Sequence, residues 1–198
     1  MKYPFLLILL CLGTFSVPAQ SSGSATLTDF RKHYVTDLYE IIKSDTAHIR
    51  FYPEDKNFVV NAAVKLLPDE KVFKLTTSSG KKKEARKYAL LSFTVNGKSC
   101  ALYVYQLLAL TAKEETANHL FLPFIDETSG KESYGGGRYI DLEIPDIKNG
   151  SVTIDFNKAY NPYCAFTTGY NCPIPPRENT LSLAVKAGER YNAKKFKH

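Results

Sequence analysis

The sequence predicts a mainly β protein, an antiparallel β-barrel or sandwich with one N-terminal amphipathic helix. After Pro53 the chain consists of short stretches rich in β-branched and aromatic residues, which turn signals separate. Before Pro53, apolar residues recur at helical spacing in a single segment. One helix followed by many short strands differs from the alternation that builds parallel sheets, so we expect antiparallel strands.

The helix is expected over residues 26–44. Thr26 and Asp29 form a start that resembles a capping box. The apolar residues that follow at helical spacing are Leu27, Phe30, Tyr34, Leu38, Ile41 and Ile42. We expect this apolar face to pack on the sheet.

Strands are expected at residues 58–66, 72–77, 88–95, 99–106, 139–143, 152–156 and 181–186. Asn96 and Gly97 separate two of them and predict a type I′ hairpin, because both residue types accept positive φ angles. Asn149 and Gly150 predict a second hairpin, between the strands at 139–143 and 152–156. The basic run at residues 80–87 is expected to be a solvated hairpin connection.

The beginning of the chain predicts export. A positive charge precedes an apolar run at residues 5–12, and the small residues Val17 and Ala19 precede a polar segment, which is the layout of a signal peptide. The apolar run is too short to cross a bilayer, so no membrane span is expected. We predict a signal peptide at residues 1–19 and a single β-rich domain at residues 20–198, periplasmic or secreted.

Charge and composition limit the classes of partner that we expect. The chain has 26 Lys and Arg against 20 Asp and Glu, a formal net charge of +6. This moderate excess favours solubility and weak attraction to anionic surfaces, and its basic runs lack the stacking residues of single-strand nucleic-acid sites. The four histidines are scattered without metal-ligand spacing, and no cofactor motif is present. We therefore expect no nucleic-acid partner, no metal and no cofactor.

Cys164 and Cys172 are close in sequence and are expected to form a disulfide in an oxidising compartment. Cys100 is expected to be a buried small hydrophobe in a strand. The alternative for Cys164 is a catalytic thiol, although no histidine lies near it in sequence.

Residues 121–179 are the unusual part of the chain, because long loops rich in Gly, Pro, Asn and Tyr interrupt short strands. Three glycines at residues 135–137 precede Arg138. Glycine lets the backbone approach a ligand closely, and the planar guanidinium binds carboxylate or phosphate, so this pair predicts an anion clamp. The alternative is that Arg138 pairs with Asp126 or Asp155 as part of the structure.

Polar and aromatic residues around this segment complete the predicted ligand site. The full set of candidate ligand-binding residues is Asp126, Tyr134, Arg138, Tyr139, Asp155, Asn157, Tyr160 and Asn161. In this hypothesis the tyrosines form walls and the asparagines orient the ligand. Asn and Asp also stabilise turns by bonding their own backbone, which is the structural alternative.

Five segments carry a resemblance to a known family. They are residues 124–130 (Phe-Ile-Asp-Glu-Thr-Ser-Gly), 134–139 (Tyr-Gly-Gly-Gly-Arg-Tyr), 155–164, 172–176 and 178–179. Together they are similar to the bacterial domain-of-unknown-function family 1684, with weaker similarity at residues 51–53 and 96–97. The resemblance covers most of residues 20–198. It implies a bacterial protein and a shared site region, and it implies no activity.

Three functions are compatible with these residues. The leading hypothesis is an exported binding module that holds a small polar or anionic ligand at a loop-lined barrel end. The second is a hydrolase that uses Asp126 and Asp155 as acid and base, or Cys164 as nucleophile. The third is a structural or interaction protein without a ligand, which predicts a flat, filled barrel end.

Overall fold

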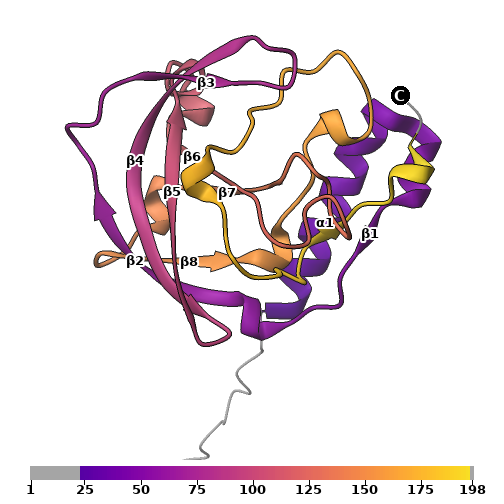
Figure 1. The fold of residues 1–198 in the computed structure, drawn as a ribbon, viewed down its shortest axis with the longest axis horizontal. Helices are drawn as coiled ribbons and strands as arrows, with labels where there is room; N and C mark the ends of the chain where they lie inside the picture. Colours follow the sequence, from indigo (N-terminus) through magenta and orange to yellow (C-terminus); the bar gives the residue numbers. More distant parts are fainter. Residues whose placement is uncertain (1–22, 197–198) are drawn as a thin grey trace, which may run out of the picture.

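The computed structural model describes residues 23–196. The predicted signal peptide at residues 1–19, with its cleavage site after Ala19, lies outside the described residues. Within them, the main sheet is seven-stranded and antiparallel, in the order β7-β6-β5-β4-β2-β8, with β3 paired to one end of β4. The sheet curls into a half-barrel (Figure 1). The mainly β, antiparallel fold with one N-terminal helix is therefore confirmed.

The elements have the following bounds. The strands are β1 (Arg50–Phe51), β2 (Val59–Leu66), β3 (Phe73–Thr76), β4 (Lys82–Val95), β5 (Lys98–Leu107), β6 (His119–Phe124), β7 (Arg138–Glu143), β8 (Ser151–Asp155) and β9 (Glu189–Arg190). The α-helices are α1 (Gly23–Ile42) and α2 (Leu108–Thr111). The 3-10 helices are η1 (Lys43–His48), η2 (Lys56–Phe58), η3 (Glu114–Thr116), η4 (Ile144–Asp146), η5 (Phe156–Lys158), η6 (Tyr163–Ala165), η7 (Arg177–Asn179) and η8 (Ala193–Lys195).

The hairpin at Asn96 and Gly97 is confirmed. Their φ angles are 49° and 75°, and β4 and β5 pair directly on either side of them, with Val95 opposite Lys98. Two consecutive positive φ angles are the requirement of a type I′ turn. This turn fixes the register of the longest ladder in the sheet.

The second predicted hairpin is wrong. Asn149 and Gly150 do form a tight turn, with φ angles of 52° and 73°, but β7 and β8 do not pair with each other. Instead β7 pairs with β6 and β8 pairs with β2, so they are the two end strands of the curled sheet. β7 does not pair with β8 because β6, a strand that was not predicted from the sequence, pairs with β7 instead.

Two further expectations need correction. Residues 181–186 are not a strand: Leu181, Leu183 and Val185 are buried, but their backbone bonds to side chains and loops instead of a ladder. The basic run is not a connection, because residues 82–87 belong to β4 and only residues 77–81 form the turn. Within this run Ala85 is buried, while Lys82 and Lys83 are exposed and Lys87 is half-buried.

The largest hydrophobic cluster fills the curl of the sheet and contains Leu91, Leu102, Phe124, Ile154 and Phe156. The helix α1 was expected to pack on this sheet, and that expectation is wrong. Its residues Leu38 and Ile42 belong to a second cluster with Ile49, Ala165, Phe166 and Phe196, beside β1 (Figure 1). Leucine and isoleucine find an apolar surface there because irregular segments cover the open side of the half-barrel.

Two glycines allow a matched test of this fold. Gly97 and Gly188 both have positive φ angles, 75° and 76°. A Cβ at Gly97 meets nothing within 4 Å, whereas one at Gly188 lies 2.5 Å from the Ala159 carbonyl oxygen and 2.7 Å from that of Phe156. We predict that Gly97→Ala lowers the free energy of unfolding by about 1 to 2 kcal/mol through conformation alone. Gly188→Ala should cost at least about 2 kcal/mol more, because the added methyl group must displace backbone.

Urea unfolding of the two variants beside the unmodified protein measures both values. Equal losses would show that the contacts of Gly188 do not constrain the fold.

Candidate functional site

Arg138, the predicted anion clamp, is fully buried. Its Nη1 donates to the carbonyl oxygens of Ala187 and Glu189, and its Nη2 donates to Val185 O at 2.8 Å. Nη2 also contacts the Asp126 carboxylate at 3.3 Å. Burial lowers the pKa of the guanidinium, and Asp126 opposes this shift. The structural pairing with Asp126 is therefore the arrangement found, and the Arg138 side chain has no solvent-exposed surface.

Asp126 is the centre of the same buried network. Its oxygens accept hydrogen bonds from Thr128 Oγ1, from Ser129 Oγ at 3.2 Å and from the backbone N–H of Val185 at 2.7 Å. Asp155 belongs to a separate network, in which Asn157 donates to it from both its backbone N–H and its Nδ2 at 3.0 Å. A buried, saturated Asp126 cannot exchange protons with a substrate, which removes the basis for an acid and base pair with Asp155.

Two predicted asparagines hold loops. Asn157 makes two hydrogen bonds of 2.9 Å with the backbone N–H and carbonyl of Asp55. Asn161 donates from its Nδ2 to Arg190 O at 3.2 Å. Both side chains are buried, and these hydrogen bonds join them to protein backbone.

The glycines at residues 135–137 also allow close contacts within the protein. A Cβ at Gly136 would collide with the ring of Tyr134, and one at Gly137 would collide with Phe124 O and Pro175. Tyr134 itself donates to Cys164 O at 3.3 Å. The close approach that these glycines permit is thus made to other parts of the protein.

Glu189, which was not predicted from the sequence, is a fully buried carboxyl next to this network. Its Oε2 accepts hydrogen bonds from Tyr34 Oη and from the Asn161 N–H, both at 2.7 Å. Its Oε1 and the Asn161 Oδ1 have no hydrogen-bond partner within the described part of the chain. Burial raises the pKa of Glu189 from 4.5 to about 8. Protonation of the Glu189 carboxyl adds a hydrogen-bond donor beside two buried oxygens, Glu189 Oε1 and Asn161 Oδ1, that otherwise have no donor.

The raised pKa of Glu189 gives stability a defined pH dependence. Between the unfolded and folded pKa values the folded protein binds a proton that the unfolded chain does not, so stability falls as pH rises, by up to about 1.4 kcal/mol per unit. Glu189→Gln keeps the acceptor and donor of the protonated form and should remove this dependence. Between about pH 5.5 and 7.5 the unmodified protein should lose about 3 kcal/mol relative to the variant.

Urea unfolding at both pH values, for both proteins, provides the measurement. If the two pH profiles run parallel, Glu189 is ionised in the folded state and the assignment is wrong.

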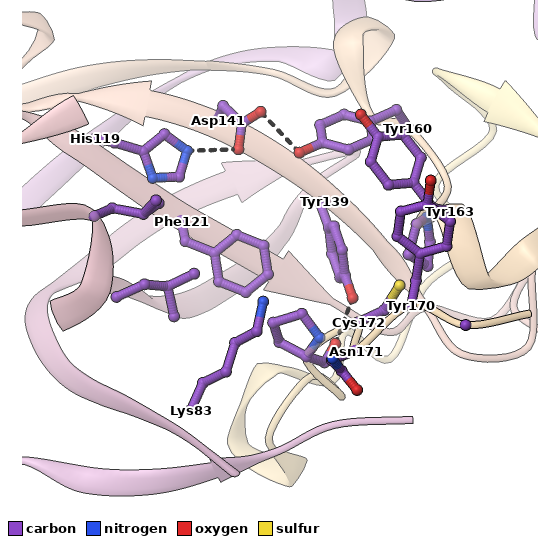
Figure 2. A pocket seen from close by; sticks show the side chains of 15 residues that line it. Lys83, His119, Phe121, Tyr139, Asp141, Tyr160, Tyr163, Tyr170, Asn171 and Cys172 are labelled. Carbon is purple, nitrogen blue, oxygen red and sulfur yellow. Dashed lines mark hydrogen bonds and ion pairs between the residues drawn. The ribbon is translucent and has the colours of Figure 1, made fainter. Parts of the chain in front are cut away.

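A pocket of about 630 Å³ lies against the outer face of β6 and β7, under the loop at residues 163–173 (Figure 2). Its apolar walls are the rings of Phe121, Tyr139, Tyr160, Tyr163 and Tyr170. Of the predicted ligand-binding residues, the structure brings Tyr139 and Tyr160 into this pocket. The other six line no part of it.

A chain of hydrogen bonds runs along one wall of the pocket (Figure 2). Asp141 Oδ1 lies 2.9 Å from His119 Nε2, and Asp141 Oδ2 accepts a 2.7 Å hydrogen bond from Tyr160 Oη. Burial, and next the Asp141 charge, raise the pKa of Tyr160 well above its ordinary value, so its hydroxyl remains a donor. Both oxygens of Asp141 are therefore engaged within the protein.

Lys83 extends from β4 into the pocket, and Figure 2 shows its amine directed toward the ring of Phe121. It makes no ion pair or hydrogen bond with the residues that the structure describes. Lys83, His119 and Asp141 were not predicted as site residues. Strand alternation offered one signal, since Asp141 lies two residues after Tyr139 and shares its face.

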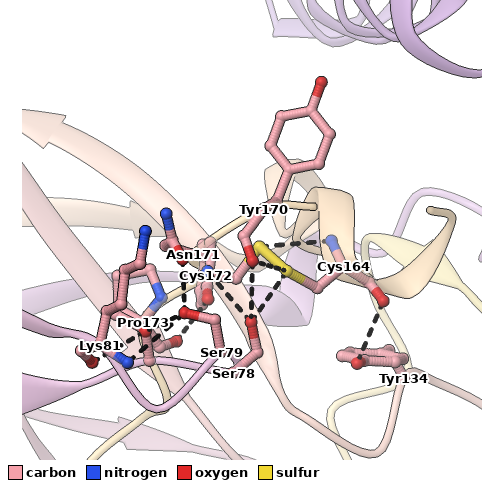
Figure 3. The surroundings of a disulfide bond; sticks show 11 residues. Ser78, Ser79, Lys81, Tyr134, Cys164, Tyr170, Asn171, Cys172 and Pro173 are labelled. Atoms are coloured by element: carbon pink, nitrogen blue, oxygen red, sulfur yellow. Dashed lines mark hydrogen bonds between the residues drawn. A yellow bond between two sulfur atoms is a disulfide. The ribbon is translucent and has the colours of Figure 1, made fainter. Parts of the chain in front are cut away.

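The predicted disulfide between Cys164 and Cys172 is present, with a Cα–Cα distance of 6.2 Å. Cys164 is consequently not a free nucleophile. Ser78 bonds both ends of the bridge: its Oγ lies 3.0 Å from Cys164 Sγ and accepts from the Cys172 N–H at 3.2 Å (Figure 3). The bridge closes the loop that carries Tyr170 over the pocket. Cys100 is free and half-buried in β5.

Within residues 23–196, no group of three or more His, Cys, Asp or Glu side chains is arranged to hold a metal ion. None of the helices in the same range is both long enough and apolar enough to cross a membrane.

The profile of a family described as "Protein of unknown function (DUF1684)" matches residues 45–190. The chain belongs to this family. Among solved structures, the solution NMR structure of an uncharacterised protein from Haloarcula marismortui is similar, with 30% sequence identity and a TM-score of 0.61. That match covers 84% of this chain and 96% of the other. No curated protein matches significantly. The family resemblance of the sequence motifs is thereby confirmed.

Proposed function

We propose that this DUF1684 protein is a binding module for a small anionic ligand, held in the pocket between β6, β7 and the disulfide-closed loop. The observation that carries the proposal is an unpaired cation. Lys83 makes no ion pair with the described residues, while Asp141, the one carboxylate among those that line the pocket, already bonds His119 and Tyr160. An anion brings the charge and the acceptors that the Lys83 ammonium group lacks.

Three kinds of donor contribute. The Lys83 ammonium group brings a positive charge and three N–H donors. Asn171 accepts a hydrogen bond from Ser79 through its Oδ1, which leaves its Nδ2 as a donor near the pocket. The Tyr163 and Tyr170 hydroxyls make no hydrogen bond with described residues, and both rings are more than one-third exposed.

The rival functions have weaker support. A hydrolase with Asp126 as acid or Cys164 as nucleophile needs groups that are buried or bridged. The interpretation without a ligand gives no role to the hollow of about 630 Å³ under residues 163–173. A ligand pocket of this size is typical of small-molecule sites.

The anion proposal predicts ligand-dependent thermal stability. In a panel of small carboxylates, phosphates and sulfonates, the ligand that fits should raise the melting temperature in proportion to log concentration, equivalent to about 2.7 kcal/mol at a hundred times its Kd. Lys83→Gln should weaken this shift, because it removes the charge and retains most of the side-chain length. Lys65→Gln, on β2 and outside the pocket, is the matched control.

If no anion shifts the melting temperature, or if Lys83→Gln responds like Lys65→Gln, the proposed function fails.

We also propose that the protein is exported to the periplasm or medium after removal of residues 1–19. The disulfide between Cys164 and Cys172 supports this, because such bonds persist in oxidising compartments. Intact-mass analysis of protein recovered from its native host should give a chain that begins at Gln20, with one free thiol, at Cys100. A cytosolic chain that retains Met1 would contradict export.

A further inference from the structure

We infer that the ligand is a planar aromatic acid: a flat, unsaturated ring system that carries one carboxylate or sulfonate group. This inference rests on the proposed function and adds the shape and chemistry of the uncharged part of the ligand. Two features of the pocket carry it, the exposed tyrosine pair on the loop and the unpaired Lys83 at the other end.

The aromatic rings that line the pocket form two groups. Phe121 and Tyr139 meet edge to face with centroids 4.7 Å apart, and Tyr139 meets Tyr160 in the same way at 5.8 Å. On the loop, Tyr163 and Tyr170 form another such pair at 5.1 Å. Figure 2 shows the pair at one end of the pocket and Lys83 toward the other, with Phe121 and Tyr139 between them. Phe121 and Tyr139 are 4% and 5% exposed, so a flat ligand that extends from Lys83 toward the pair stacks chiefly on Tyr163 and Tyr170.

The charged group of the ligand has one counter-ion in the pocket. Lys83 makes no ion pair with the described residues, whereas Asp141 already bonds His119 and Tyr160. A carboxylate or sulfonate group is therefore expected beside Lys83, with the ring system directed toward the tyrosine pair.

The loop position of the tyrosine pair makes this surface accessible. Tyr163 and Tyr170 are 38% and 37% exposed, so part of each ring remains uncovered by protein. Aromatic pairs add about 0.5 to 1.5 kcal/mol beyond the burial of apolar area, which corresponds to about twofold to tenfold in affinity. A saturated ring of equal size gains only the affinity that comes from burial of apolar area.

Isothermal titration with three matched probes tests the inference: naphthoate, the neutral naphthamide and the saturated decahydronaphthoate. We expect naphthoate to bind at least about threefold more tightly than decahydronaphthoate and about tenfold more tightly than naphthamide. Tyr170→Leu should remove the preference over decahydronaphthoate. Lys83→Gln should remove the preference over naphthamide, and Lys65→Gln should change neither.

The outcomes separate this inference from the proposed function. If decahydronaphthoate, or the sugar acid glucuronate, binds as tightly as naphthoate and depends on Lys83, the aromatic inference is overturned while the anion site stands. If neither these acids nor inorganic phosphate binds, both fail. If naphthamide binds as tightly as naphthoate, the charged group has no role and both fail.

Discussion

The buried contact between Arg138 and Asp126 organises the irregular half of this protein. A buried guanidinium needs partners for its donors, and here Nη1 and Nη2 bond one carboxylate and the carbonyl oxygens of Val185, Ala187 and Glu189. The Nε–H has no hydrogen-bond partner among the described residues. Asp126 in turn accepts from the N–H of Val185. The segment that was expected to be a strand is therefore held by these two side chains and by single backbone hydrogen bonds to Ile125 and Glu127, and not by a ladder. This is how the open side of the half-barrel is closed although β7 and β8 do not pair.

Other irregular segments are also held by buried polar side chains that bond their backbone. Asn179 donates to Tyr103 O and Pro123 O and accepts from the Tyr103 N–H, so one amide joins β5, β6 and the C-terminal loop. Asn157 does the same for the backbone of Asp55. Buried backbone groups need partners, and amide side chains supply donor and acceptor together. Long loops thus remain ordered, and the pocket that they cover keeps a defined wall.

Local features of the fold followed from the sequence because they depend on neighbouring residues. The α1 helix, both Asn-Gly turns and the disulfide between Cys164 and Cys172 depend on short-range signals. The partner strand of β7 and the surroundings of Arg138 could not be predicted from the sequence, because they depend on residues far along the chain. A polar residue beside glycines has the same sequence pattern whether its partner is a ligand or the carbonyl of Val185.

Strand alternation explains why the predicted site residues are divided between the buried network and the pocket. Arg138 and Tyr139 are adjacent on β7, so their side chains point to opposite faces of the sheet. Arg138 enters the buried network, while Tyr139 enters the pocket beside Asp141. Two neighbouring residues of the glycine–Arg138–Tyr139 motif therefore have their side chains on opposite faces of β7.

This division limits what the family resemblance implies. The polar residues that carry it, among them Asp126, Arg138 and Asn157, hold loops together, whereas Lys83 and His119 lie outside those segments. A relative can keep every loop contact and still change the charge that faces the pocket. Membership of the family therefore predicts the framework of the site, and the ligand must be determined from the pocket residues of each protein.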